Sequence, residues 1–146
     1  MRSRSAFTLI ELVVVVMIIG IIAAIVTPKV VKMTQTATDN SARQTLTVLR
    51  GAIDAYASSN NGAFPTLTGS GSTSFVTTYL RSAAFPACPV GAAAGNNGVT
   101  VQTTGAELSG NADASPTNGW KFDSSSGEII INSNATDHGG VQYSTY

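Results

Sequence analysis

The sequence predicts an α+β protein in which one long N-terminal helix packs on a small antiparallel β-sheet. Three observations carry this prediction: an apolar run near the N-terminus, an apolar stripe with helical spacing after it, and two strand-like runs around a glycine-containing turn. The chain has 146 residues, enough for one small domain beside its N-terminal segment. After Ser58 the composition changes to Ser, Thr, Asn, Gly and Ala.

Composition excludes some classes of function. The formal net charge is zero and only 11% of residues are charged, whereas a nucleic-acid-binding protein shows a basic excess. Cys88 is the single cysteine, so it forms no disulfide within the chain, and we interpret it as a small buried residue.

The apolar run extends from Phe7 to Val26. It covers about 20 residues, so as a helix it would be about 30 Å long, the thickness of a bilayer core. Arg2 and Arg4 precede it and predict a cytoplasmic N-terminus. A secretory signal peptide is the alternative, but its apolar region is usually shorter and no small-x-small cleavage site follows this run.

Glu11 lies inside the apolar run and neither a plain anchor nor a signal peptide explains it. A carboxylate in a bilayer interior costs about 3 kcal/mol on insertion scales. Such a residue indicates a functional site with a partner.

Ala6 followed by Phe7-Thr-Leu-Ile-Glu11 resembles the processing site of type IV prepilins and type II secretion pseudopilins. The resemblance implies that residues 1–6 are a leader, which a membrane prepilin peptidase removes before Phe7, and that the new N-terminus is methylated. Ala6 stands where the family usually has Gly, so we expect slower or more permissive processing. Gly20 and Pro28 fall where the family has a Gly and a Pro.

The resemblance also implies an assembly role for two of these residues. In a filament, Glu11 of one subunit would pair with the Phe7 α-amino group of a neighbour, and such a pair in a low-dielectric core favours one axial register. Residues 7–28 would be the membrane and filament-core helix. Pro28 predicts a kink or local break, and Gly20 weakens the same stretch, which partly melts in filaments of the family.

Residues 29–58 predict an amphipathic second half of the same helix, from Phe7 to about Ser58 in total. Arg43, Arg50 and Asp54 are assigned to its other face, and Ser58 to Gly62 would end it. The apolar positions recur at steps of three and four residues and must be buried against residues 59–146. This stripe consists of Ala42, Leu46, Leu49, Ile53 and Tyr56.

Residues 59–146 predict a globular head of antiparallel strands and loops. The turn from Asn61 to Pro65 resembles the one that follows the first helix in many pseudopilins. A short helix or turn is expected at Phe75–Arg81 and a strand near Val99–Val101. Gly119–Phe122 and Glu128–Ile131 predict a hairpin around a glycine-containing loop, with Trp120 as a core anchor. These elements together make the pilin fold that the resemblance implies.

We expect no enzyme and no cofactor. The sequence holds no phosphate-binding glycine loop, no paired metal ligands and no nucleophile elbow, and His138 stands alone. Calcium remains an open alternative, because some major pseudopilins bind it in their last loops, although the acidic residues here lack a calcium-loop spacing. These acidic residues are Asp113, Asp123, Glu128 and Asp137.

The predicted function is therefore a structural filament subunit. Its expected partners are further copies, minor pilins or pseudopilins, prepilin peptidase, an inner-membrane assembly platform and membrane lipid, with no nucleic acid bound directly. It would be a single-pass inner-membrane protein first and a periplasmic or cell-surface filament later. A type II secretion pseudopilus, a type IV pilus and a DNA-uptake filament all stay open. The rival class is a singly anchored extracytoplasmic binding or adhesion domain that does not polymerise.

Overall fold

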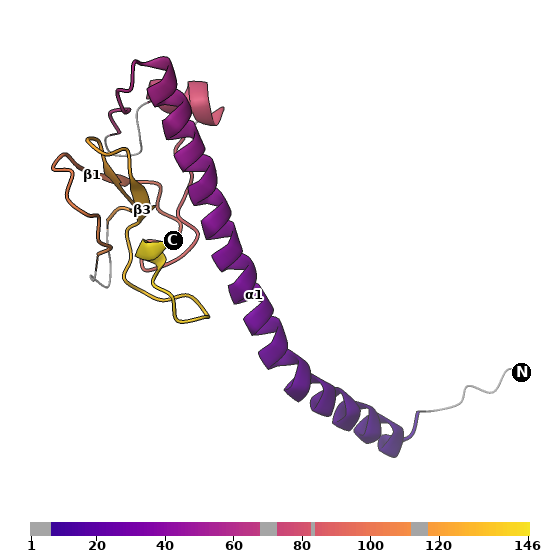
Figure 1. Cartoon of the computed structure of the whole chain (residues 1–146). Coiled ribbons are helices and arrows are strands. Elements are labelled where there is room, and N and C mark those ends of the chain that lie inside the picture. The colour runs from indigo at the N-terminus through magenta and orange to yellow at the C-terminus, as the bar shows by residue number, and fades with distance from the viewer. Residues whose placement is uncertain (1–6, 68–72, 83, 112–116) are drawn as a thin grey trace, which may run out of the picture. The chain divides into compact units, whose positions relative to one another are not determined.

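The computed structural model describes residues 7–67, 73–82, 84–111 and 117–146 (Figure 1). The predicted leader, residues 1–6, lies outside these ranges. The chain divides into two compact units, Met1–Thr34 and Gln35–Tyr146. Each unit is described on its own.

Helix α1, Leu9–Ser59, is the element that contributes to both units. Its bounds agree with the predicted helix to within two residues at either end. It ends where Asn61 and Gly62 adopt positive φ angles of 54° and 84°, and the Gly62 N–H donates to the Ala57 carbonyl at 2.8 Å. Glycine adopts this left-handed conformation without a steric penalty, which explains the stop at this position.

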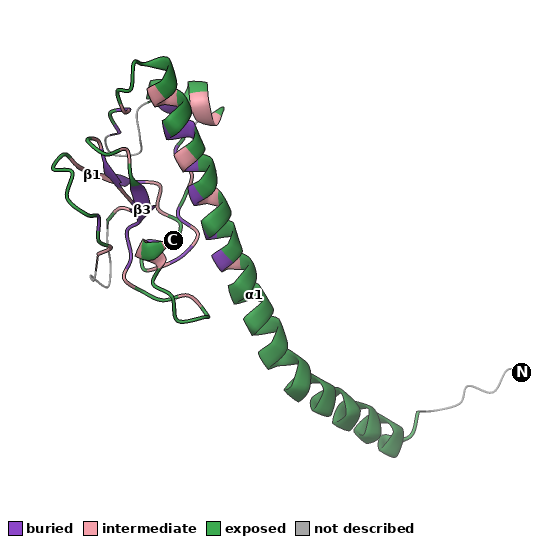
Figure 2. Ribbon diagram, in the orientation of Figure 1, coloured by how far each residue is buried: buried purple, intermediate pink, exposed green. Residues whose placement is uncertain are grey.

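The first unit buries none of the side chains that the structure describes. Every described residue from Phe7 to Thr34 is exposed, and Figure 2 shows this part of α1 in the colour of exposed residues. A helix that is apolar all round and uncovered requires an environment other than water, either lipid or other protein.

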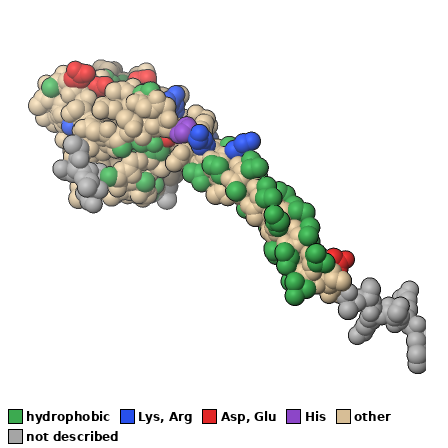
Figure 3. Space-filling model, turned by 90° about the horizontal axis from the view of Figure 1, so that it is seen from below, with side chains coloured by type: hydrophobic (Ala, Val, Ile, Leu, Met, Phe, Trp, Pro, Cys, Tyr) green, Lys and Arg blue, Asp and Glu red, His purple; other side chains and the backbone are tan. Residues whose placement is uncertain are grey.

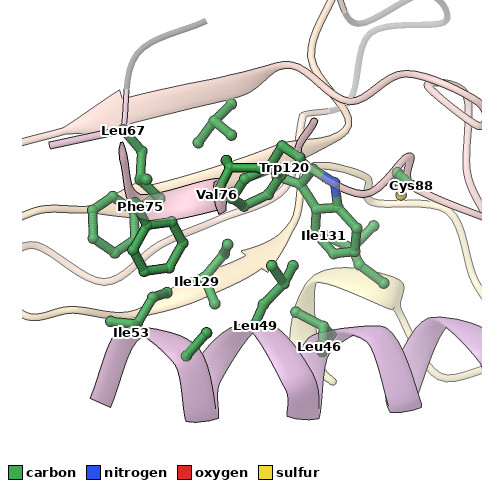
Figure 4. Close-up of a cluster of buried hydrophobic side chains, with 14 of the residues drawn as sticks. Leu46, Leu49, Ile53, Leu67, Phe75, Val76, Cys88, Trp120, Ile129 and Ile131 are labelled. Carbon is green, nitrogen blue, oxygen red and sulfur yellow. The ribbon is translucent and has the colours of Figure 1, made fainter. Parts of the chain in front are cut away.

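The second unit has its core where the amphipathic stripe of α1 meets the head. Four of the five predicted stripe residues are fully buried, and Tyr56 packs against them at the edge. Figure 4 shows Leu46, Leu49 and Ile53 pointing from the helix toward Ile129 and Ile131. The prediction that the head covers the stripe is confirmed.

In the described part of the head, three strands form one sheet with the order β1-β2-β3: β1 is Val99–Gln102, β2 is Trp120–Asp123 and β3 is Ile129–Ile131. The β2–β3 hairpin is antiparallel, as predicted. The strands β1 and β2, however, are parallel, so the prediction of a wholly antiparallel sheet is wrong and the sheet is mixed. Alternating apolar residues identify a strand but do not encode the direction of its partner, which here depends on the long connection between the two.

Short helical turns complete the second unit. The helix expected near Phe75 is present as α2, Thr73–Phe75, and η1, Val76–Leu80, a single π-helical turn. A 3₁₀ turn, η2, covers Tyr143–Thr145. The fold is thus the predicted α+β class, a long N-terminal helix with a small sheet.

Trp120 is the core anchor that the sequence indicated. It is fully buried, its indole N–H donates to the Pro86 carbonyl at 2.8 Å, and its ring meets that of Phe85 edge-on at 6.4 Å. Cys88 is buried nearby, and this burial raises the pKa of its thiol.

Candidate functional site

Thr8 and Glu11 form a capping box at the start of α1. The Glu11 N–H donates to Thr8 Oγ1 at 3.3 Å, and Glu11 Oε2 accepts from the Thr8 N–H and from its hydroxyl, both at 2.8 Å. This reciprocal pattern satisfies backbone donors that a helix start leaves without partners. Thr-x-x-Glu before an apolar run is the sequence signal of such a box, which the predictions above do not include.

Apolar side chains are the neighbours of the exposed Glu11 on the helix surface. It lines a surface hollow of about 390 Å³ together with Phe7, Ile10, Val14 and Val15. Phe7 is 72% exposed, and Figure 3 shows hydrophobic side chains covering this part of the helix. The helix N-terminus stabilises the charge of this carboxylate, because the N–H groups of the first turn carry partial positive charge.

The two hydrogen bonds that Thr8 donates, from its N–H and its hydroxyl, both reach Oε2 of the Glu11 carboxylate. Oε1 takes part in neither of them. A carboxylate offers about four lone-pair sites, so capping its own helix leaves Glu11 able to accept a hydrogen bond from a second donor.

The other predicted residues of this segment lie on the same helix. Gly20 and Pro28 are both inside α1, which continues through them without interruption. A β-carbon at Gly20 would meet nothing within 4 Å in its own chain. Melting of this stretch in a filament stays a prediction. Ala6, the residue before the expected cleavage, lies outside the described residues.

In length and composition α1 is suited to crossing a membrane. Within the described ranges it is the one helix that is long and apolar enough, and none of its most apolar window is buried. This property supports membrane anchoring near the N-terminus.

A second cluster of polar contacts holds residues 135–146, here called the C-terminal strap, against α1. Asp39 is only 7% exposed, and its carboxylate accepts hydrogen bonds from the Tyr143 hydroxyl at 2.7 Å and the His138 N–H at 3.2 Å. Burial raises the pKa of the Tyr143 phenol, and the bond to Asp39 raises it further. The buried carboxylate therefore has the partners that its burial requires.

Arg43 extends this cluster one turn along the helix. Its guanidinium lies 2.9 Å from Asp137 Oδ2 and 4.2 Å from the centre of the Tyr146 ring. The Tyr146 hydroxyl donates to the same Asp137 oxygen at 2.6 Å, which lowers the pKa of that carboxyl, with the Val141 N–H next in effect. Ion pairing, cation–π contact and hydrogen bonding thus converge on one end of the strap.

Arg50 is the third residue of α1 in this cluster. Its guanidinium donates to the carbonyls of Ile129 and Tyr146 at 3.2 and 2.5 Å. Arg43 and Arg50, which the sequence assigns to the face of the helix other than the apolar stripe, both contact the head. Their partners lie roughly a hundred positions away, and helical spacing gives no signal for such contacts.

The acidic residues considered for calcium do not converge. Asp123 accepts hydrogen bonds from Ser125 and Gln102, Asp137 pairs with Arg43, and Glu128 is exposed. Asp113 lies outside the described residues. In the part of the chain that the structure describes, no three His, Cys, Asp or Glu side chains are grouped to hold a metal ion.

Comparison with known proteins gives one match. Residues 1–27 match the family model of the prokaryotic N-terminal methylation motif. No curated protein and no solved structure matches the chain. The matched range includes Phe7, Thr8 and Glu11, so the motif and the capping box occupy the same few residues. The chain therefore carries the N-terminal methylation signature of type IV pilins and pseudopilins, on an α+β, pilin-like architecture.

Proposed function

We propose that this chain is a structural subunit, not an enzyme, of a helical filament of the type IV pilus or type II secretion pseudopilus kind. Before assembly it is stored in the bacterial inner membrane through the first part of α1, with its N-terminus on the cytoplasmic side. After assembly the same helix lines the filament core, and the filament is periplasmic or on the cell surface.

One observation carries this proposal. The Glu11 carboxylate lies within a methylation motif, on a helix whose apolar side chains are left uncovered by the described residues of its own unit. In lipid, this end of the helix can reach the headgroups, where water solvates the charge. In a filament core water is excluded, and an unpaired charge would cost several kcal/mol. The Phe7 amine of a neighbouring copy is the cation that cleavage supplies, and Glu11 Oε1 is the oxygen that can accept from it.

Processing precedes this pairing. Prepilin peptidase cleaves between Ala6 and Phe7, and methylation of Phe7 leaves its amine positively charged. The other partners are further copies of the chain, minor pilins or pseudopilins and an inner-membrane assembly platform.

Mass spectrometry of the N-terminus, combined with recovery of sheared filaments, tests the proposal. Cells that carry a complete assembly system should yield a chain that begins with methylated Phe7, both in membranes and in sheared filaments. An intact Met1 in the membrane fraction, with no filament recovered, would instead indicate a singly anchored binding domain. A single substitution, Ala6→Gly, provides a control: it should increase the rate of cleavage without changing the cleavage position.

A further inference from the structure

Thr8 occupies the N-cap position of α1. Its carbonyl accepts a hydrogen bond from the Leu12 N–H at 3.3 Å, while Thr8 itself lies just outside the helix, which begins at Leu9. The Thr8 hydroxyl oxygen accepts a hydrogen bond from the Glu11 N–H, also at 3.3 Å. A threonine with these two contacts ends a helix on its N-terminal side.

The bond from Glu11 decides where the helix begins. In an α-helix each N–H donates to the carbonyl four positions earlier, so the Glu11 N–H would bond the Phe7 carbonyl if the helix extended toward the N-terminus. In this chain the same N–H donates to the Thr8 hydroxyl instead. Phe7 therefore stays outside the helix, and its side chain is 72% exposed.

Without such a cap the helix would gain stability by extending toward the leader. Ala6 stands directly before Phe7, and alanine has the highest helix propensity of all residues. A backbone N–H without a partner is costly in apolar surroundings, and a longer helix would satisfy such groups one after another. The capping box removes this pressure, because side chains accept from the N–H groups of both Thr8 and Glu11.

We infer that Thr8 is a positioning residue for leader removal: its hydroxyl stops α1 at Leu9 and so holds Phe7, the residue after the cleaved bond, out of the helix. The inference rests on the proposed function, which puts the cleavage between Ala6 and Phe7. Peptidases prefer segments outside regular structure, because a helix must first unwind to be cut.

The chemistry of this step belongs to the peptidase. The amide bond between Ala6 and Phe7 breaks, and water supplies a hydroxyl to the new Ala6 carboxyl group and a proton to the Phe7 amine. Thr8 takes no part in these transfers. It acts only through the position at which the helix begins.

The energetics of N-caps set the size of the effect. Replacing a threonine cap by a residue that cannot cap shifts the equilibrium at a helix start by about fivefold. A chain whose binding-competent form is less populated binds more weakly by the same factor. Thr8→Val should therefore raise the KM of leader removal by up to about fivefold. The kcat should stay unchanged, because the bound chain is the same once it has unwound.

A series of side chains at position 8 separates capping from recognition of the threonine itself. Serine and asparagine cap a helix at least as well as threonine, whereas valine has the shape of threonine but no capping oxygen. With the full-length chain in detergent and purified prepilin peptidase, Thr8→Ser and Thr8→Asn should retain the wild-type KM. Thr27→Val is the matched control, since the Thr27 hydroxyl donates to the Ala23 carbonyl within α1, and it should also retain that KM.

A second substitution supplies the helix stop by other means. Proline suits the first position of a helix and holds the residue before it out of the α conformation. The double variant Thr8→Val/Leu9→Pro should therefore have the same KM as Leu9→Pro alone, although the hydroxyl is missing. A fivefold difference between these two chains would mean that the hydroxyl acts otherwise than by ending the helix.

The outcomes separate this inference from the function on which it rests. A wild-type KM for Thr8→Val would overturn the positioning role and leave leader removal intact. Equal losses in Thr8→Val and Thr8→Asn would also overturn it, because the peptidase would then recognise the threonine directly. If the peptidase fails to cleave the wild-type chain, the proposed function falls together with the inference.

Discussion

The Tyr143 hydroxyl donates a 2.7 Å hydrogen bond to Asp39 Oδ1 and thereby joins two residues that are 104 positions apart in the chain. Asp39 lies on α1 just past the start of the second unit, and Tyr143 begins the 3₁₀ turn of the C-terminal strap. The strap has no long strand of its own. Side chains of the helix hold it in place together with a backbone bond from the Ser144 N–H to the Ser133 carbonyl, just after β3.

Removing this acceptor should destabilise the head. Asp39→Ala removes the acceptor of two part-buried hydrogen bonds, from the Tyr143 hydroxyl and the His138 N–H, and each lost bond should cost about 1 kcal/mol. Tyr143→Phe removes only one bond and should cost about 1 kcal/mol. Thermal unfolding of the full chain in detergent, followed by near-UV circular dichroism, measures both.

Asp54→Ala is the matched control, since Asp54 lies on the same helix but is exposed. It should change stability by at most about 0.5 kcal/mol. Equal effects of Asp39→Ala and Asp54→Ala would refute a structural role for the buried carboxylate.

The pH dependence of the free energy of unfolding should show the contribution of the Asp137 carboxylate. The folded chain lowers its carboxyl pKa, through the Tyr146 hydroxyl first and then the Val141 N–H, so its contribution is complete above the unfolded pKa of about 3.9. That contribution is lost as the pH falls through the lower folded value. Urea unfolding between pH 7 and pH 2 should therefore show a steeper acid limb for the wild type than for Asp137→Asn. Identical acid limbs would contradict the assignment.

Glu11 should be required for assembly but not for folding or membrane storage. Glu11→Gln retains an oxygen that can cap Thr8 but removes the charge, whereas Glu11→Ala removes both. We expect both variants to be cleaved and stored normally and to yield almost no sheared filaments. Thr8→Val, which removes the cap and keeps the charge, should have a smaller effect. Wild-type yield from Glu11→Gln would show that capping, not charge, is the role of the residue.

The second unit should fold without the apolar helix. Its contacts begin at Gln35, so a chain that starts at Lys32 keeps the stripe of α1 and the whole head that covers it. Size-exclusion chromatography and near-UV circular dichroism should show a soluble monomer with fixed aromatic packing. Aggregation, or far-UV signal without near-UV signal, would mean that the head does not cover the stripe in solution.

Gly127 should not tolerate a side chain. It has a positive φ of 76° in the β2–β3 turn, and a β-carbon there would overlap the ring of Phe64. Gly127→Ala thus combines backbone strain with a clash and should cost about 1–3 kcal/mol in thermal unfolding. Gly140→Ala, also at positive φ but with open space around it, separates the strain from the clash.

Much of the fold could be predicted because its signals are local. The apolar run, the stripe from Ala42 to Tyr56 and the hairpin around Gly127 each follow from spacing within a few residues. The signal of the capping box, Thr8 followed by Glu11, is equally local.

The features that sequence could not provide depend on distant partners. The direction of β1 relative to β2 is decided by the connection between them. Likewise, Asp39 and Arg43 looked like ordinary polar helix residues, because their partners in the strap lie about a hundred positions later. Spacing within a helix tells which residues share a face, but not what that face meets.

The strap has a consequence for biosynthesis. Synthesis proceeds from the N-terminus and produces Asp39 104 residues before Tyr143, so the carboxylate lacks this partner until the strap has been made. Until then the head exposes part of its interior, and such incomplete species are the ones that proteases remove. The strap thus completes the packing of the head, and a subunit gains resistance to degradation only once the strap has docked on α1.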